Sequence, residues 1–147
     1  MKKIFTPVIL ALITFSFSRC TKTDVLADQD SIVGTWQVVG IRSNLPYDWN
    51  GDGYAETDIY GGYNYCERDI ELAFDGGGTG QSRQGCNAYW QAMNWSLSYD
   101  RRYLDIQLQG DDLNLALTRF SNNIIIGEDQ VYMNGHSFIV TYTLERR

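Results

Sequence analysis

The sequence predicts an all-β domain: a single antiparallel up-and-down barrel of about eight strands, with an open β-sandwich as the alternative. Three observations support this fold class. Apolar and polar residues alternate along several short segments, as they do in strands with one buried face. Turn-forming residues separate these segments at short intervals, and no helical stripe runs longer than two turns. Successive hairpins can remove exposed strand edges by closing into a barrel, although a sandwich also buries alternate residues.

The segments with this alternation begin near residue 31. The first predicted strand covers 31–42 and carries Trp36 as a large anchor. After a long loop, the strand 66–75 alternates between a side with Ile70, Leu72 and Phe74 and a charged side that includes Glu71. We expect the first side to face the core and the second to face water. The other predicted strands cover 94–99, 103–109, 113–120, 123–128, 129–133 and 137–145.

Two cysteines mark a hairpin in the first half of the domain. Cys66 and Cys86 lie equally far in sequence from Gly76, within the glycine-rich turn 75–78. A regular hairpin centred there would place the two cysteines opposite each other, at a Cα separation that a disulfide can span. We therefore predict a Cys66–Cys86 disulfide, as expected for an exported chain. Two buried free thiols are the alternative.

Residues 1–19 have the layout of a bacterial signal peptide, because Lys2 and Lys3 precede an apolar run at 4–17. Cys20 follows, and its position resembles that of the lipidated cysteine of lipoproteins, although Arg19 replaces the usual small residue. We expect 20–30 to be a lipidated tether and 31–147 to be the barrel domain. The protein would then be a lipoprotein of a Gram-negative cell envelope, on the periplasmic side or the cell surface. A secreted protein with a spare cysteine is the alternative.

The charge balance limits the partners. Removing 1–19 leaves nine basic residues against 18 acidic ones, a net charge of −9. That field repels phosphate backbones and anionic lipid surfaces, so nucleic-acid binding is disfavoured. We expect contact with a membrane only through the lipid anchor.

The most specific ligand pattern lies in the loop 48–58. Oxygen-bearing groups alternate there around a turn at Gly53, in the spacing of calcium loops. The predicted ligands are Asp48, Asn50, Asp52, the Tyr54 carbonyl, Glu56 and a late carboxylate, Asp58. Asp58 comes one residue early and no amphipathic helix flanks the loop, so we predict a structural calcium ion between strands rather than an EF-hand sensor. A solvated acidic turn is the alternative.

The order of these motifs resembles a known family. Gly34-Thr35-Trp36 is similar to the Gly-x-Trp that opens lipocalins, and the acidic loop, Cys66, the glycine-rich turn and Cys86 follow as in the lipocalin-like lipoproteins of Bacteroidota. The similarity covers most of residues 31–145. It implies an eight-stranded barrel on a lipid anchor, with Trp36 closing the floor and a late arginine, for which Arg119 is the candidate, packing over it. The molecular function of that family is largely unassigned.

Catalytic side chains are scarce, and we predict that the protein is not an enzyme. His136 is the sole histidine and lies beside the Asn134-Gly135 turn, which leaves no material for a catalytic triad or a multi-histidine zinc site. Glu67, Asp69 and Glu71 alternate on one strand face at separations that glycoside hydrolases use. Hydrolysis by paired acids is therefore a third hypothesis, while a charged outer face that aids solubility explains the same pattern.

Aromatic residues indicate a function more clearly than the few catalytic side chains do. The chain has 10 Tyr, 6 Phe and 4 Trp, and we predict that Tyr63, Tyr65, Trp90 and Trp95 line a ligand site; core packing is the alternative. The first hypothesis is an envelope protein that binds an apolar or glycan-like ligand at the open end of its barrel. The second is a structural lipoprotein whose filled barrel docks onto an envelope partner. Whether the barrel interior is hollow or packed discriminates between them.

Overall fold

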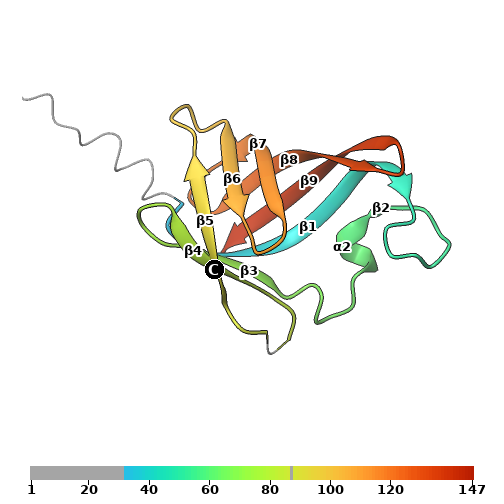
Figure 1. The fold of residues 1–147 in the computed structure, drawn as a ribbon, viewed down its shortest axis with the longest axis horizontal. Coiled ribbons are helices and arrows are strands. Elements are labelled where there is room, and N and C mark those ends of the chain that lie inside the picture. The colour runs from blue at the N-terminus through green and yellow to red at the C-terminus, as the bar shows by residue number, and fades with distance from the viewer. Residues whose placement is uncertain (1–31, 87) are drawn as a thin grey trace, which may run out of the picture.

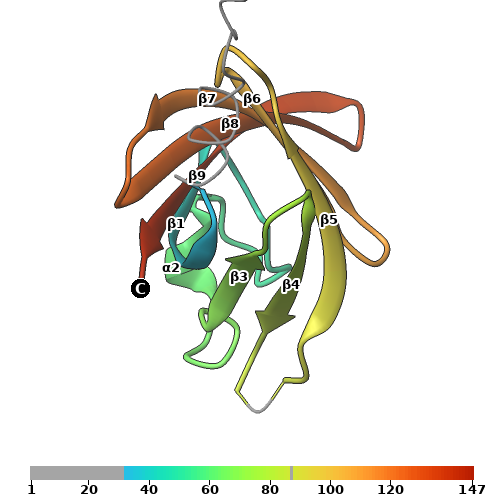
Figure 2. The same ribbon diagram turned by 90° about the vertical axis from the view of Figure 1, so that its left-hand side faces the viewer.

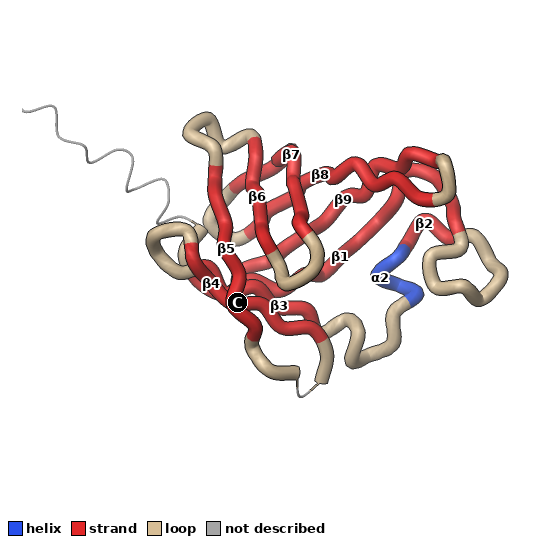
Figure 3. The backbone as a smooth tube through the Cα atoms, viewed as in Figure 1, coloured by secondary structure: helices blue, strands red, loops and turns tan. Residues whose placement is uncertain are grey.

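The structure is a computed structural model that describes residues 32–86 and 88–147. The predicted signal peptide 1–19, the lipidation site Cys20 and the tether 20–30 lie outside the described residues. The described residues form one sheet with a single short helix beside it, as Figure 3 shows. They contain no helix with the length and apolar character needed to span a bilayer.

The sheet has nine strands, all paired antiparallel, and it closes on itself (Figures 1 and 2). The elements are β1 (Gly34–Tyr47), β2 (Glu56–Asp58), α2 (Ile59–Gly62), β3 (Ile70–Phe74), β4 (Thr79–Gln84), β5 (Gln91–Leu97), β6 (Tyr103–Gln107), β7 (Asp112–Phe120), β8 (Ile124–Met133) and β9 (His136–Arg146).

Closure comes from β1, which pairs on one edge with β3 and on the other with β9. Trp36 is opposite Leu72 in the first pairing and opposite Arg146 in the second. Strands β3 to β9 follow one another in sequence order, so β1 and β3–β9 make an eight-stranded ring and β2 pairs with β1 beside it. The predicted up-and-down barrel is confirmed, and the open sandwich is not formed.

Some predicted strand limits were wrong. The segments 123–128 and 129–133 are one strand, β8, which pairs with β9 from Ile124 to Met133. The predicted break between 128 and 129 is absent, because the pairing with β9 continues through Glu128 and Asp129. The first strand runs on to Tyr47, and β3 begins only at Ile70. Cys66 therefore lies in a turn before β3.

Alternate residues of the strands face the interior and pack one end of the barrel solid. The side chains of Trp36, Phe74, Leu104, Leu115 and Ile125 are at most 1% exposed. Burying each such side chain contributes about 1.5–3 kcal/mol. This packed end, which we call the floor, holds the start of β1, where Gly34 pairs with Phe74.

Trp36 and Arg146 close the floor. The indole N–H of Trp36 donates to the Ile32 carbonyl at 2.7 Å. The Arg146 guanidinium lies 4.4 Å from the centre of the Trp36 ring, within cation–π distance. It also donates to the backbone carbonyls of Val33, at 2.7 Å, and of Asn122. Arg146 therefore ties the last strand to the start of the first strand and to the β7–β8 turn.

The arginine chosen from the sequence, Arg119, is the wrong one. Arg119 is an exposed residue on β7, next to a register shift in the β7–β8 ladder. Arg146 is instead the direct β1–β9 partner of Trp36. The same contact explains Gly34, whose φ is 132° and where an added Cβ would lie 2.5 Å from Arg146 Nη1.

The charged side of β3 is also not as predicted, because Glu71 is buried rather than solvated. Its side chain is 4% exposed and forms ion pairs with Arg83, at 2.5 Å, and with Arg147. Arg83 also pairs with Asp69 at 3.6 Å, and the hydrogen bond to Glu71 is the main reason why the pKa of Arg83 is raised. The two arginines cover Glu71 on the outside of the barrel.

The Cys66–Cys86 disulfide is present, with the two Cα atoms 4.7 Å apart. Its place differs from the one expected. The β3–β4 ladder pairs Ile70 with Gln84 and Phe74 with Gly80, so the hairpin is centred on residue 77 rather than 76. The disulfide thus joins the loops just beyond the ladder, next to the hydrogen bond from Gly85 N–H to the Asp69 carbonyl.

We expect Arg146→Ala to lower the free energy of unfolding by about 2–3 kcal/mol, because it removes the cation–π contact with Trp36 and the charge-assisted hydrogen bonds to the carbonyls of Val33 and Asn122. Arg119→Ala is the matched control and should change it by less than about 0.5 kcal/mol, as is usual for an exposed site. Urea unfolding followed by tryptophan fluorescence measures both. Equal losses in the two variants would contradict the role of Arg146 in the floor.

Replacing both Cys66 and Cys86 by alanine should cost about 3 kcal/mol of stability, the value expected for a loop of this length, since the cysteines are 20 residues apart. A reductant should lower the urea midpoint of the wild-type protein and leave that of the double variant unchanged. Alkylation of both thiols in the native protein without prior reduction would rule out the disulfide.

Candidate functional site

The end of the barrel away from the floor, which we call the mouth, is hollow. A cavity of about 560 Å³ lies there, within the size range of small-molecule sites. Its inner wall is largely aliphatic and comes from β1, β3, β7, β8 and β9: Val38, Ile41, Leu72, Leu113, Val131 and Val140.

The cavity forms where β1 and β3 separate. Only Gly34 to Gln37 of β1 pair with β3, whereas pairing with β9 continues to Ser43. The loop after β1, the short strand β2 and helix α2 lie at this end (Figure 1). Ile59 and Tyr63 from the α2 region line the cavity. The chain that follows β1 thus lines the opening between β1 and β3.

Trp49 packs onto the barrel rather than outward. Its ring, the Tyr47 ring and the Phe138 ring meet edge to face, with centroids 5.1 to 5.3 Å apart. Trp49 also lines the cavity, and its Nε1 is buried without a hydrogen-bond acceptor among the described residues. A buried donor of this kind costs about 1–3 kcal/mol when unpaired, so an acceptor group on a bound ligand would be favourable here.

Polar groups enter this apolar space at few points. Asp111 lies just before β7, Asp112 is the first residue of β7 and Asp129 lies on β8; Gln84 and Gln130 also line the cavity. Asp129 pairs across the ladder with Val140, which is buried. Since residues two apart on a strand share a face, Asp129 lies on the inward face with Gly127 and Val131.

Two tyrosines in the cavity have perturbed acidity. Burial raises the pKa of Tyr142 to about 12, and the carboxylates of Asp129 and Asp111 add to the rise. Burial also raises the pKa of Tyr63, with Glu67 as a second cause. Both phenols therefore stay protonated at neutral pH and can donate a hydrogen bond.

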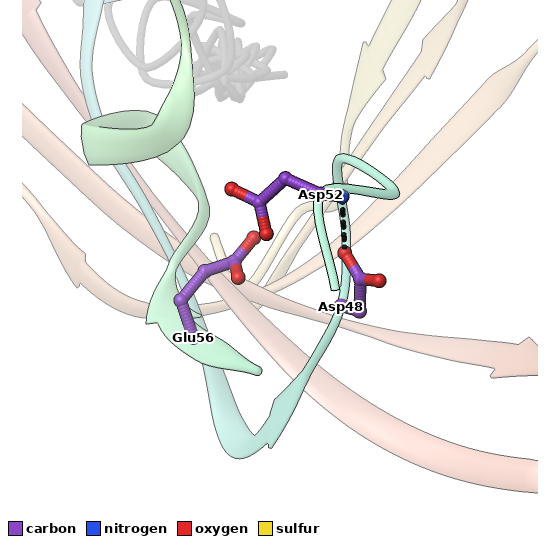
Figure 4. Close-up of side chains that lie close together, drawn as sticks. All are labelled: Asp48, Asp52 and Glu56. Carbon is purple, nitrogen blue, oxygen red and sulfur yellow. Dashed lines mark hydrogen bonds between the residues drawn. The ribbon is translucent and has the colours of Figure 1, made fainter. Parts of the chain in front are cut away.

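The acidic loop after β1 brings three predicted calcium ligands together. Asp48, Asp52 and Glu56 each offer a carboxylate oxygen, and these oxygens lie within 4.8 Å of one another (Figure 4). The loop is shaped by Asp48, whose carboxylate accepts hydrogen bonds from the backbone N–H groups of Gly51, Asp52 and Gly53. Backbone donors thus hold the carboxylate in place.

The other predicted ligands are arranged differently. Asn50 donates to the Asp52 carboxylate at 3.0 Å, so it lies beside the cluster. The Tyr54 backbone N–H donates to Asp52, while the Tyr54 ring is exposed. Asp58 lies apart from the cluster: it caps α2 by accepting from Gly61 N–H and forms an ion pair with Arg42 at 3.5 Å.

Of the four aromatic residues predicted to line a ligand site, the structure puts Tyr63 in the cavity. Trp95 is 5% exposed and packs against Phe74 in the core, with its indole N–H on the Thr79 carbonyl at 2.7 Å. Tyr65 is 86% exposed, and Trp90 lies on the outside below the guanidinium of Arg83. The four residues do not form one cluster.

The carboxylates considered for hydrolysis lie on the outside of the barrel. Asp69 and Glu71 pair with Arg83, and Glu67 accepts from the Asn64 N–H at 2.8 Å. His136 is an exposed residue at the start of β9. None of these residues lines the cavity at the mouth.

Asp129 and Tyr142 were missed in the sequence. The signal was present: continuous alternation from Ile125 through Gly127 and Asp129 to Val131 places a charged residue at an inward position. Splitting β8 into two strands concealed it. Tyr142 follows the same rule on β9, between Val140 and Leu144, which are both buried.

No family model matches this chain, and no curated protein matches its sequence. Among solved structures, the chain is similar to lobster apocrustacyanin A1, with 14% identity and a TM-score of 0.46, and to apocrustacyanin C2, with 13% identity and a TM-score of 0.45. Each comparison covers 85% of this chain and 68% of the other. The lipocalin-like fold follows from the strand order, the closure through β1 and the contact of Trp36 with Arg146.

Proposed function

We propose that this protein is a non-enzymatic binding protein whose barrel holds an apolar ligand in the cavity at its mouth. The observation that carries the proposal is the contrast between the two ends of the barrel. The floor is packed by fully buried side chains, whereas about 560 Å³ at the mouth is left unfilled. Covering apolar wall and apolar ligand together contributes about 25 cal/mol per Å² of surface removed from water.

The cavity also favours the first of the two function hypotheses over the second. A structural lipoprotein that acts only through its outer surface has no need of a hollow interior, and a filled barrel would have favoured docking. The aliphatic lining favours an apolar ligand over a glycan, since sugar sites rely on stacking against flat aromatic faces and on many polar groups. The aromatic residues of this lining are Trp49, Tyr63 and Tyr142, and the rest of its apolar wall is aliphatic.

We further propose that the protein works in the cell envelope, held there by a lipid on Cys20. The Cys66–Cys86 disulfide supports export, because such bonds form and persist in oxidising compartments. The signal-like segment at 1–19 and the position of Cys20 support attachment of a lipid.

The acidic loop is proposed to hold a structural calcium ion. The three converging carboxylates of Asp48, Asp52 and Glu56 support this assignment, because Ca²⁺ prefers carboxylate oxygens in flexible arrangements. Without a counter-ion, three such groups at this distance repel one another. The loop also carries Trp49, so an ion there would steady one wall of the cavity.

Binding of a neutral apolar dye such as N-phenylnaphthylamine should raise the dye's fluorescence and saturate. Val131→Trp, which places a large side chain in the cavity, should weaken binding at least about tenfold, because it occupies the volume that the dye needs. The neighbouring exposed residue gives the control: Tyr132→Trp adds bulk on the outside of β8 and should leave the affinity unchanged.

Circular dichroism and melting curves should be similar for both variants, so that loss of binding is not loss of fold. If Val131→Trp does not fold, competition between the dye and decanol on the wild-type protein replaces it. Dye affinities that are equal in the two folded variants, or no saturable binding by the wild-type protein, would overturn the proposed function.

Calcium at about ten times its Kd should stabilise the fold by about 1.4 kcal/mol and raise Tm by about 5 °C relative to the chelated protein, because it binds only the folded loop. Glu56→Gln should lose most of this shift. Glu145→Gln makes the same change at an exposed position on β9 and should keep it. Identical melting curves with calcium and with chelator would remove the ion from the loop.

A further inference from the structure

In the described part of the chain, the charges that line the cavity are all of one sign. They belong to Asp111, Asp112 and Asp129, and no arginine or lysine among residues 32–86 and 88–147 lines it. Charges on a protein surface are usually mixed. A wall whose charged groups are all carboxylates therefore presents a negative potential to anything that enters, strengthened by the low dielectric of the barrel interior.

Asp129 is the most unusual of the three. It occupies an inward position in the middle of β8, directly opposite buried Val140, and it is itself half-buried. Moving an isolated carboxylate out of water is costly unless a positive partner or hydrogen-bond donors compensate. A polar residue such as Thr or Gln would fill the position without that cost.

Ion pairs elsewhere in the described residues do not include these aspartates. The acids that pair with arginine are Asp58, Asp69, Glu71 and Asp100. The cavity aspartates instead act on a residue of the cavity wall. The carboxylates of Asp129 and Asp111 are among the causes that raise the pKa of the Tyr142 phenol. Within residues 32–86 and 88–147, the cavity thus has acceptors without a cationic partner.

The arrangement does not suit a metal ion. A chelated cation needs ligand atoms that converge, as those of Asp48, Asp52 and Glu56 do. Among the described residues, Asp111, Asp112 and Asp129 form no such group. Carboxylates spread around an apolar space suit an organic cation, which is larger and interacts over several ångströms.

We propose that the ligand of this cavity is a cationic amphiphile: an apolar body that lies against the aliphatic wall and a protonated amine that meets Asp129, with Asp111 and Asp112 at the rim. The inference rests on the proposed function, and it names the chemical class of the ligand. The same charges exclude fatty acids and other anionic amphiphiles, because a carboxylate head would face three like charges.

Three ligands that share one alkyl chain test this directly: decylamine, decanol and decanoate, each titrated below its micellar concentration by displacement of N-phenylnaphthylamine. We expect decylamine to bind at least about tenfold more tightly than decanol, as for a charge-assisted hydrogen bond in a half-buried site. Decanoate should bind more weakly than decanol. The preference for the amine should fall as salt is added.

Asp129→Asn keeps the shape of the side chain and removes its charge, so the ratio of the decylamine and decanol affinities should fall towards one. Asp75→Asn is the matched control: it removes the same charge from an exposed turn outside the cavity and should keep the wild-type ratio. Asp111→Asn should lower the ratio less than Asp129→Asn. Melting curves check that each variant is folded.

The outcomes separate the two proposals. If decylamine and decanol bind equally to the wild-type protein, the cavity binds ligands and the inference about their charge is wrong. If Asp75→Asn lowers the ratio as much as Asp129→Asn, the preference reflects net charge and the inference is also wrong. If neither ligand displaces the dye and the dye itself does not bind, the proposed function fails.

Discussion

The fold depends on β1 pairing with two neighbours at once. Around Trp36 and Gln37, β1 is hydrogen-bonded both to β3 and to β9, and this is where a curled sheet becomes a closed barrel. The register shift between Val38 and Gly40 then bends the strand, as bulges do. Beyond it, β1 stays with β9 and leaves β3. The same strand, β1, therefore closes the barrel at the floor and leaves it open at the mouth.

The two ends of the barrel differ in how they treat polar groups. At the floor, the cationic Arg146 is accommodated because the Trp36 ring and backbone carbonyls surround it. On the outer wall, Glu71 is buried because Arg83 and Arg147 cover it. In both places the charge has partners, as a charge that is removed from water requires. At the mouth, the half-buried Asp129 forms no ion pair among the described residues, and local exceptions of this kind tend to mark functional sites.

How much could be predicted from the sequence depended on the range of the interactions. Alternation and turn residues act locally, and they predicted the barrel and most strands. The disulfide was predicted because it closes a local hairpin, even though the true centre of that hairpin lies one residue later. Arg146 could not be preferred to Arg119 from spacing alone, because its role depends on the β1–β9 register. Glu71 was expected in water because nothing local shows that two arginines from other segments cover it.

The candidate site followed the same pattern. The acidic loop could be predicted because its candidate ligands are close in sequence, and the carboxylates of Asp48, Asp52 and Glu56 do converge. The cavity could not be predicted, since its lining comes from strands far apart in the chain. Tyr63 was found, whereas Trp95 proved to be core, because a list of aromatic residues does not say which of them face an unfilled space. A single misplaced break in β8 hid Asp129.

The covalent link at the base of the β3–β4 hairpin has a consequence for the durability of the protein. The exposed glycine-rich tip at 76–77 lies between Cys66 and Cys86, and exposed tips of small residues are preferred sites of proteolytic attack. A single cut there cannot release either fragment, because the sulfur bridge still holds the two pieces together. The hydrogen bonds of β3 and β4 to their neighbours can then keep a nicked chain assembled.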